Sequence, residues 1–456
     1  MDDNARRIPL PARAITRARR RRVLGLAVLA GLTAASLVGA RALRRPANGP
    51  VVSTVFLDQT MGPVAIDPRT GHAFVLTWGA GPAHLTILDT HTGALVRTLA
   101  VGSTPAGGVG ALGVDSSAGH VLAAVAGDAA AGTVASVTTL DARGGTVLDR
   151  VAIPSSPLAL MVDERAHRAV VAGMGAVTAA GTQADTESAL DTRTGRLLRA
   201  VRTPTRGDTT VVAVDARAGR TLIFTRRDDR PSSRLDVIAT GTGRRVARRD
   251  QPLAPWTAAV DEVTHRAFTL AGRDVAVYDT RTGRLVRRVP MGAGAAVAVD
   301  AGTQRVFVAR APFIAGVGGA IMVLDAADGR VLRTLAVGGN PTTLTLDARR
   351  DRVLVTDAGR LDGAGVVSGS GRLLVLDGHG GADVRAIPLA GVPGEVAVDE
   401  RTGRVVVGSG ALPGVTITDP WVGLRAGLRR GLPFLQLSLP QPRTVGGSVS
   451  LLDLAR

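Results

Sequence analysis

The chain has 456 residues, of which 45% are hydrophobic and none is cysteine. The ordinary apolar fraction argues against a disordered chain, and the absence of cysteine excludes disulfides, thiolate metal sites and cysteine nucleophiles. All 55 basic residues are arginine and face 38 acidic residues, which gives a net charge of +17. Residues 1–45 contain 11 arginines and two aspartates, so more than half of the excess positive charge lies in a tenth of the chain. This distribution argues against nucleic-acid binding.

The N-terminal segment predicts a membrane anchor. Four consecutive arginines, 19–22, precede the 18 uncharged residues 23–40. As a helix these 18 residues would be about 27 Å long, close to the thickness of a hydrocarbon core. The arginines before the segment place the N-terminus in the cytoplasm and the rest of the chain outside it. We therefore expect a single-pass membrane protein with a signal-anchor helix in residues 1–45; secretion after signal cleavage is the alternative.

An internal repeat organises the chain after residue 50. A short apolar run that ends in aspartate recurs eight times, at Asp67, Asp115, Asp163, Asp215, Asp261, Asp300, Asp347 and Asp399. Each copy is followed by a polar turn and by further apolar runs rich in β-branched residues, which are typical of strands. Units of four short strands that repeat every 39–52 residues predict the blades of a β-propeller. The fold class is therefore all-β.

The ends of the repeat region indicate how the ring closes. The last unit ends without a fourth strand, whereas residues 51–58 form an extra strand before the first unit. We expect this N-terminal strand to complete the last blade, which leaves no free sheet edge at the junction. The prediction is an eight-bladed propeller over residues 46–456 with an inserted loop at 409–447; seven blades are the alternative.

The repeats resemble the YVTN family of β-propeller repeats, which occurs in exported or surface proteins of prokaryotes. The resemblance covers residues 50–456 and rests on the strand–Asp–turn pattern and on runs such as DTRTG followed by an apolar strand. The sequence closest to the family's Tyr-Val-Thr-Asn is residues 354–357, Leu-Val-Thr-Asp. The resemblance implies a propeller exposed outside the cytoplasm.

The repeated polar residues are interpreted as turn residues. Six of the seven histidines fall in turns of the repeat, with His72, His120, His167 and His265 in the first turn of different units and His91 and His379 in the turn after the third strand. Equivalent positions lie far apart round a ring, so they cannot converge on one ion, and we predict no metal site and no cofactor. The repeated aspartates are expected to accept hydrogen bonds from turn amides.

Loop lengths predict which face of the ring binds a partner. The extra residues fall between the second and third strands, at 173–187, 310–320, 357–371 and 409–447, and antiparallel order places these loops on one face. Loops on a rigid scaffold commonly carry binding residues. A basic amphipathic helix is expected within 409–447. The candidate contact residues on this face are Trp78, Trp256, Phe313, Asp357, Trp421, Arg425, Arg429 and Phe434.

Two functions remain open. The first is a membrane-tethered binding or scaffold module whose looped face engages a protein, a glycan or a small ligand. The second is an enzyme, because propellers with related repeats include lactonases and quinone-dependent dehydrogenases. Such an enzyme would need acids with arginine or histidine around the central channel, and no spacing in the sequence selects that set.

Overall fold

The structure is a computed structural model of the whole chain. It describes residues 40–43, 50–57, 59–79, 81–103, 110–128, 132–174, 184–204, 209–226, 232–240, 242–311, 318–361, 367–368, 371–379, 384–410 and 447–454. Contacts divide the chain into residues 1–41 and residues 42–456, and the fold described below is that of the second unit. Within the described residues, no helix is long and apolar enough to cross a bilayer. Residues 23–39 of the predicted anchor lie outside the described residues.

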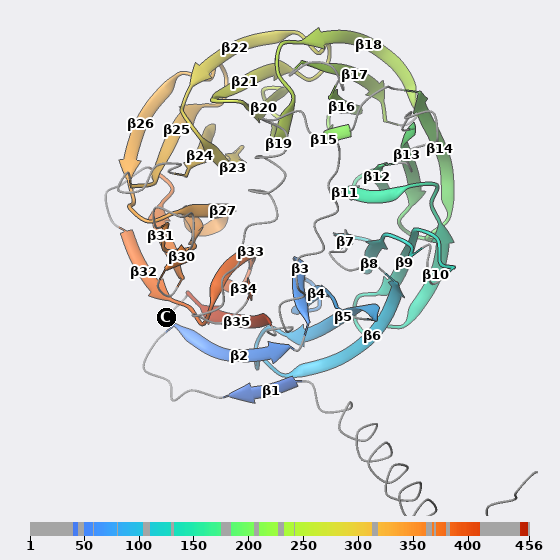
Figure 1. Cartoon of the computed structure of the whole chain (residues 1–456), viewed down its shortest axis with the longest axis vertical. Coiled ribbons are helices and arrows are strands. Elements are labelled where there is room, and N and C mark those ends of the chain that lie inside the picture. Colours follow the sequence, from blue (N-terminus) through green and yellow to red (C-terminus); the bar gives the residue numbers. More distant parts are fainter. Residues whose placement is uncertain are drawn as a thin grey trace, which may run out of the picture. The chain divides into compact units, whose positions relative to one another are not determined.

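Eight four-stranded antiparallel blades follow one another round a ring (Figure 1). The first four are β3 (Thr60–Asp67), β4 (His72–Trp78), β5 (Pro82–Asp89) and β6 (Leu95–Ser103); β7 (Gly110–Asp115), β8 (His120–Val125), β9 (Ser136–Asp141) and β10 (Val147–Ala152); β11 (Ser156–Asp163), β12 (Arg168–Met174), β13 (Ala184–Asp191) and β14 (Leu197–Pro204); β15 (Thr209–Asp215), β16 (Arg220–Arg226), β17 (Ser233–Ala239) and β18 (Arg244–Gln251).

The other four blades repeat the pattern. They are β19 (Pro255–Asp261), β20 (Arg266–Ala271), β21 (Asp274–Asp279) and β22 (Leu285–Pro290); β23 (Gly294–Asp300), β24 (Arg305–Arg310), β25 (Ala320–Asp325) and β26 (Val331–Ala336); β27 (Pro341–Asp347), β28 (Arg352–Asp357), β31 (Arg372–Asp377) and β32 (Val384–Pro388); β33 (Val392–Asp399), β34 (Arg404–Gly410), β35 (Gly447–Asp453) and β2 (Val51–Leu57). A 3-10 helix, η1 (Ala348–Arg350), follows β27.

Strand β2 closes the ring as predicted. The last sheet has the order β1-β2-β35-β34-β33, where β1 is Ala40–Leu43, so a strand from before the first blade completes the eighth. Val55 of β2 pairs with Val449 of β35, and both side chains are buried. The innermost strand of each blade contacts that of the next, and β33 contacts β3. The prediction of eight blades is confirmed, and the seven-bladed alternative is wrong.

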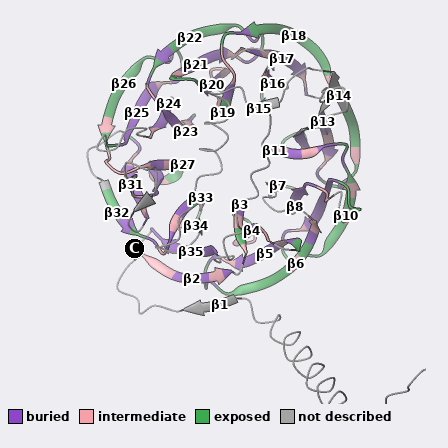
Figure 2. Ribbon diagram, viewed as in Figure 1, coloured by how far each residue is buried: buried purple, intermediate pink, exposed green. Residues whose placement is uncertain are grey.

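The core lies between the blades. Both faces of a blade's second and third strands pack against neighbouring blades, so β4 buries five consecutive residues from Ala73 to Thr77. Leu85 of blade 1 shares one apolar cluster with Val121 of blade 2. The outermost strands of blades 1, 2, 4, 5 and 6 are exposed over most of their length (Figure 2), whereas β2 of blade 8 is buried or half-buried. This arrangement explains why each unit needs its neighbours to bury its apolar residues.

The two ends of the ring differ. The turns between the first and second strands, and between the third and fourth, lie at one end, here called the turn face. The loops between the second and third strands and the connections between blades lie at the other, here called the loop face. At the turn face, Asp163 Oδ1 accepts the amide hydrogens of Arg165 and Ala166, each at 3.0 Å. The structural interpretation of the repeated aspartates is confirmed at such turns.

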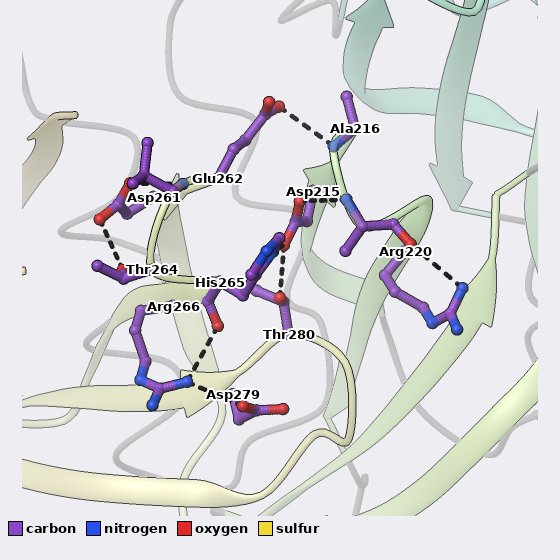
Figure 3. A network of polar contacts seen from close by, with 12 residues as sticks. Asp215, Ala216, Arg220, Asp261, Glu262, Thr264, His265, Arg266, Asp279 and Thr280 are labelled. Carbon is purple, nitrogen blue, oxygen red and sulfur yellow. Dashed lines mark hydrogen bonds and ion pairs between the residues drawn. The ribbon is translucent and has the colours of Figure 1, made fainter. Parts of the chain in front are cut away.

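Two of the turn histidines bind the preceding blade, and Figure 3 shows the contact that His265 makes. His265 Nδ1 lies 2.9 Å from Asp215 Oδ2, and Thr280 Oγ1 donates to the same oxygen at 2.5 Å. Glu262 accepts the amide hydrogen of Ala216 at 3.1 Å, which adds a second bond between blades 4 and 5. His167 makes the equivalent contact with Asp115 across blades 2 and 3, at 3.1 Å. These histidines therefore join adjacent blades.

Two predicted loops contain strand residues. Residues 173–187 form a shorter connection than expected, because β12 extends to Met174 and β13 begins at Ala184. The predicted loop 357–371 contains the short hairpin β29 (Arg360–Leu361) and β30 (Val367–Ser368). These polar and small residues have a weak propensity for β-strands, so pairing with a neighbouring strand decides their conformation.

Candidate binding site at the loop face

The innermost strands share a β-bulge near the loop face. In seven of the eight, the pairing with the second strand shifts register within the first five residues; the exception is β7. A bulge leaves one or more residues unpaired and changes the direction of the side chain there. The loop-face end of the innermost ring is therefore built from unpaired residues on a rigid frame.

Trp256 is the bulged residue of blade 5. Its neighbours Pro255 and Thr257 pair with Ala271 and Leu270, which leaves Trp256 without a partner in the register of β19 and β20. Its side chain is 39% exposed. It is also the single aromatic residue in the eight innermost strands. The innermost ring thus presents one large aromatic surface to solvent at its loop-face end.

Glu395 occupies the bulge of blade 8. It lies between Pro393 and Val396, where the pairing of β33 with β34 shifts. Apart from the aspartate that closes each strand, it is the single charged residue in the eight innermost strands. Solvent reaches the residue, yet the surrounding protein desolvates the carboxylate and raises the pKa of Glu395. A carboxyl group in this setting can accept hydrogen bonds or, when protonated, donate one.

The side chain of Trp78 packs between two blades rather than forming an exposed contact surface. An added Cβ on Gly62 would lie 2.3 Å from Trp78 Cζ3, and one on Gly110 would lie 3.4 Å from the same atom. The indole of Trp78 therefore fills the space that these two glycines leave at the junction of blades 1 and 2. Trp78 is half-buried and contacts the apolar cluster of that junction. These contacts favour a structural role for Trp78.

The carboxylate of Asp357 accepts hydrogen bonds from residues at the loop-face end of blade 7. The residue is fully buried, and its Oδ2 accepts Arg372 Nε at 2.7 Å. Its Oδ1 accepts the amide hydrogens of Asn340 and Gly359, at 2.7 and 3.0 Å. Both carboxylate oxygens thus hold the loop-face end of blade 7 together, which favours a structural role here too.

The remaining predicted contact residues lie outside the described part of the chain. They are Phe313, Trp421, Arg425, Arg429 and Phe434. The predicted amphipathic helix within 409–447 also falls there, except that β34 includes Ser409 and Gly410 and β35 begins at Gly447. Of the predicted set, Trp256 is the residue that the structure places at an exposed bulge.

Sequence reasoning missed Glu395. The sequence does distinguish this residue. When the eight innermost strands are aligned, β33 is the strand that has a charged residue before its closing aspartate. Most of the predicted contact residues come from the long loops, whereas Glu395 and Trp256 lie on the innermost strands. Trp256, predicted only as a contact residue of the loop face, is the second residue of β19.

Comparisons with known proteins establish the fold alone. No family model matches the chain, and no curated protein matches it. The computationally designed protein Ika8 is 16% identical with a TM-score of 0.56, covering 78% of this chain and 94% of that one. A europium-containing methanol dehydrogenase is 14% identical with a TM-score of 0.51, covering 84% and 89%. BamB from Moraxella catarrhalis is 17% identical with a TM-score of 0.48, covering 79% and 96%.

The likenesses to the designed protein and to the methanol dehydrogenase agree with the strand order. The chain folds as an eight-bladed β-propeller. At these identities the comparisons carry no information on activity, and a propeller supports many unrelated functions. The YVTN-repeat family therefore stays a prediction from the repeats.

Proposed function

We propose that the propeller is an extracytoplasmic binding module that engages its partner at the loop face. The observation that supports this is Trp256, the single aromatic residue of the innermost strands, which lies exposed at a bulge. Exposed tryptophans are frequent anchors of binding surfaces, since they bury a large apolar area with little loss of side-chain entropy. The rigid blades on either side keep the anchor in place.

The partner's chemistry follows from the two bulge residues. Trp256 offers an apolar ring face, on which a sugar ring, an aromatic group or an aliphatic side chain can stack. Glu395 offers a carboxyl group whose pKa is raised by desolvation, and such a group suits a hydroxyl-rich ligand better than a strongly hydrated cation. The two residues lie on blades 5 and 8, so a glycan or a protein loop long enough to reach both blades fits them together, and a small ligand with hydroxyl groups fits one of them.

The membrane tether is part of the proposal. Residues 23–40 are uncharged and follow four arginines, a pattern that predicts an anchor with the propeller outside the cytoplasm. A tethered propeller would act on partners at the cell surface. Fractionation of cells that express the full chain, with protease added to intact cells, tests the topology. Recovery of protease-resistant propeller in the cytoplasm would exclude it.

Affinity capture from cell envelopes tests the binding role. Full-length wild-type protein is compared with Trp256→Ala, Glu395→Gln and a control, Val263→Ala, which changes an exposed residue of the turn face. We expect both loop-face variants to lose bound material and the control to keep it. Equal recovery of the same partner by all four proteins would overturn the loop face as the binding surface.

An enzyme with a site near the ring axis is the second candidate. The observation in its favour is Glu395, because a carboxyl group with a raised pKa suits general acid catalysis. Among the described innermost strands, however, no arginine, histidine or second non-terminal acid accompanies it. A lactonase-like or dehydrogenase-like reaction would therefore need groups from the loops. Turnover that is lost in Glu395→Gln would favour this candidate over simple binding.

A further inference from the structure

Two turns of blade 7 bring three metal-ligating side chains together on the turn face. Asp351 follows η1 in the turn before β28, Asp377 ends β31, and His379 lies in the next turn. One ligand atom from each of these side chains lies within 4.8 Å of the other two. His379 Nδ1 is in contact with Asp351 Oδ2 and lies 3.7 Å from Asp377 Oδ1. We propose that Asp351, Asp377 and His379 bind a divalent transition-metal ion.

The two turns are held together by backbone bonds, so the ligands are positioned before an ion arrives. The amide of Gly378 donates to the carbonyl of Asp351 at 2.7 Å, and Arg352 pairs with Asp377 in the register of β28 and β31. Arg305 of blade 6 donates to the carbonyl of Gly378 at 3.1 Å. Preorganised ligands lose little conformational entropy on binding, whereas the nearby guanidinium reduces the attraction for a cation.

Asp351 also has an unsatisfied atom. Its Oδ1 is shielded from water and has no hydrogen-bond partner among the described residues. A carboxylate oxygen in that state is costly, and charge on the group is favoured when a cation binds it. The side chain as a whole is 27% exposed and its Oδ2 contacts His379, so a cation that binds the carboxylate would offset this cost.

Blade 1 provides an internal comparison. It has the same aspartate and histidine in its third turn, Asp89 and His91, and the imidazole of His91 lies over the equivalent first-turn residue. That residue is Gly71, which has no ligand atom. Among the described blades the same position is otherwise glycine, histidine or glutamine, in each case with a positive φ. Blade 7 is the blade that adds a carboxylate to the aspartate–histidine pair.

The ligand types indicate which ions fit. Two carboxylate oxygens and one imidazole nitrogen suit Zn²⁺, Co²⁺ or Mn²⁺, since Ca²⁺ and Mg²⁺ prefer all-oxygen sites with more ligands. Three protein ligands leave coordination positions for water or for a group on a partner. His379 is 64% exposed, so such a group could reach the ion.

Titration of the full chain with Zn²⁺ and Co²⁺ tests this site. The protein, free of any histidine tag and treated with chelator, is titrated by calorimetry, and Co²⁺ binding is followed by its visible absorption. Wild type is expected to bind one ion saturably. Asp351→Gly and His379→Ala are expected to bind roughly tenfold more weakly or worse. Asp351→Gly recreates the blade 1 turn and suits the positive φ, so loss of folding is not expected.

His91→Ala is the matched control, because it removes the equivalent histidine of blade 1. It is expected to bind the ion as wild type does. The proposal is overturned if wild type shows no saturable binding, if both blade 7 variants bind as tightly as wild type, or if His91→Ala weakens binding as much as they do. Thermal denaturation of each variant without metal confirms that differences in binding do not reflect unfolding.

Discussion

His265 Nδ1 lies 2.9 Å from Asp215 Oδ2, and the two residues belong to neighbouring blades. Asp215 is fully buried, and its carboxylate also accepts Thr280 Oγ1 and the amide of Ala218. One aspartate thus closes its own turn and binds two residues of the next blade. The same arrangement recurs between blades 2 and 3, where Asp115 accepts His167 and Thr192.

Replacing Asp215 by alanine is expected to destabilise the propeller by about 3 kcal/mol, because it leaves several donors without an acceptor. Urea unfolding followed by circular dichroism measures the free energy of unfolding. Thr280→Val removes a single bond and is expected to cost about 1 kcal/mol. A loss in Asp215→Ala no larger than that in Thr280→Val would show that the carboxylate does not join the blades.

Glu187 is a second polar group between blades. It lies on β13 at the position that seven other blades fill with a buried aliphatic residue, namely Leu85, Val137, Leu235, Val275, Ile321, Leu373 and Val449. Glu187 is 6% exposed, and its Oε2 has no hydrogen-bond partner among the described residues. Desolvation raises the pKa of Glu187 to about 7, although Arg199 opposes the shift.

The stability of the propeller is therefore expected to fall as the pH rises from about 4.5 to 7. The unfolded chain loses this proton near pH 4.5, whereas the folded chain keeps it until about pH 7, so ionisation favours unfolding. The difference between the pKa of Glu187 in the folded and in the unfolded chain corresponds to about 3 kcal/mol in the free energy of unfolding. Glu187→Gln is expected to remove this part of the pH dependence, and Glu187→Leu to raise stability at pH 7.5 as well. Parallel pH profiles for wild type and Glu187→Gln would contradict the assignment.

The packing of Trp78 can be tested through the glycine beneath it. An added Cβ on Gly62 would lie 2.3 Å from Trp78 Cζ3 and 2.8 Å from the carbonyl oxygen of Leu76. Gly62→Ala is therefore expected to destabilise the protein by about 1–3 kcal/mol. Gly79→Ala is the control, since its nearest contact would be 3.8 Å away. Equal stability of the two variants would show that Trp78 does not fill this space.

Because β2 completes blade 8, residues at the start of the propeller are expected to be important for its stability. Val55 is 2% exposed between blades, although it lies next to the predicted anchor in sequence. Val55→Asp is expected to cost about 3 kcal/mol or more, because it buries an unpaired charge. Val96→Asp changes a residue that is 45% exposed on the outermost strand of blade 1, and it is expected to cost little. If both substitutions cost the same, β2 is not part of the core.

The repeats contain most of the information on the fold. Each blade is short and packs on its neighbours, so strand, turn and spacing could be predicted from local sequence, and the unpaired strand at 51–58 indicated closure. The contact between His265 and Asp215 could not be predicted, because it joins residues 50 positions apart whose turns meet only in the ring. The exposed bulge positions of Trp256 and Glu395 could not be predicted either. Their exposure depends on bulges, which no residue type specifies.

The proposed function requires that the loop-face end of the innermost ring contacts the partner. A photo-crosslinking amino acid at position 256 in the full-length chain, irradiated in living cells, measures this contact directly. The same crosslinker at position 263 reports on the turn face. We expect a defined adduct, or for a glycan a mass shift, from position 256 and none from position 263. An adduct from position 263 alone, or identical adducts from both, would contradict it.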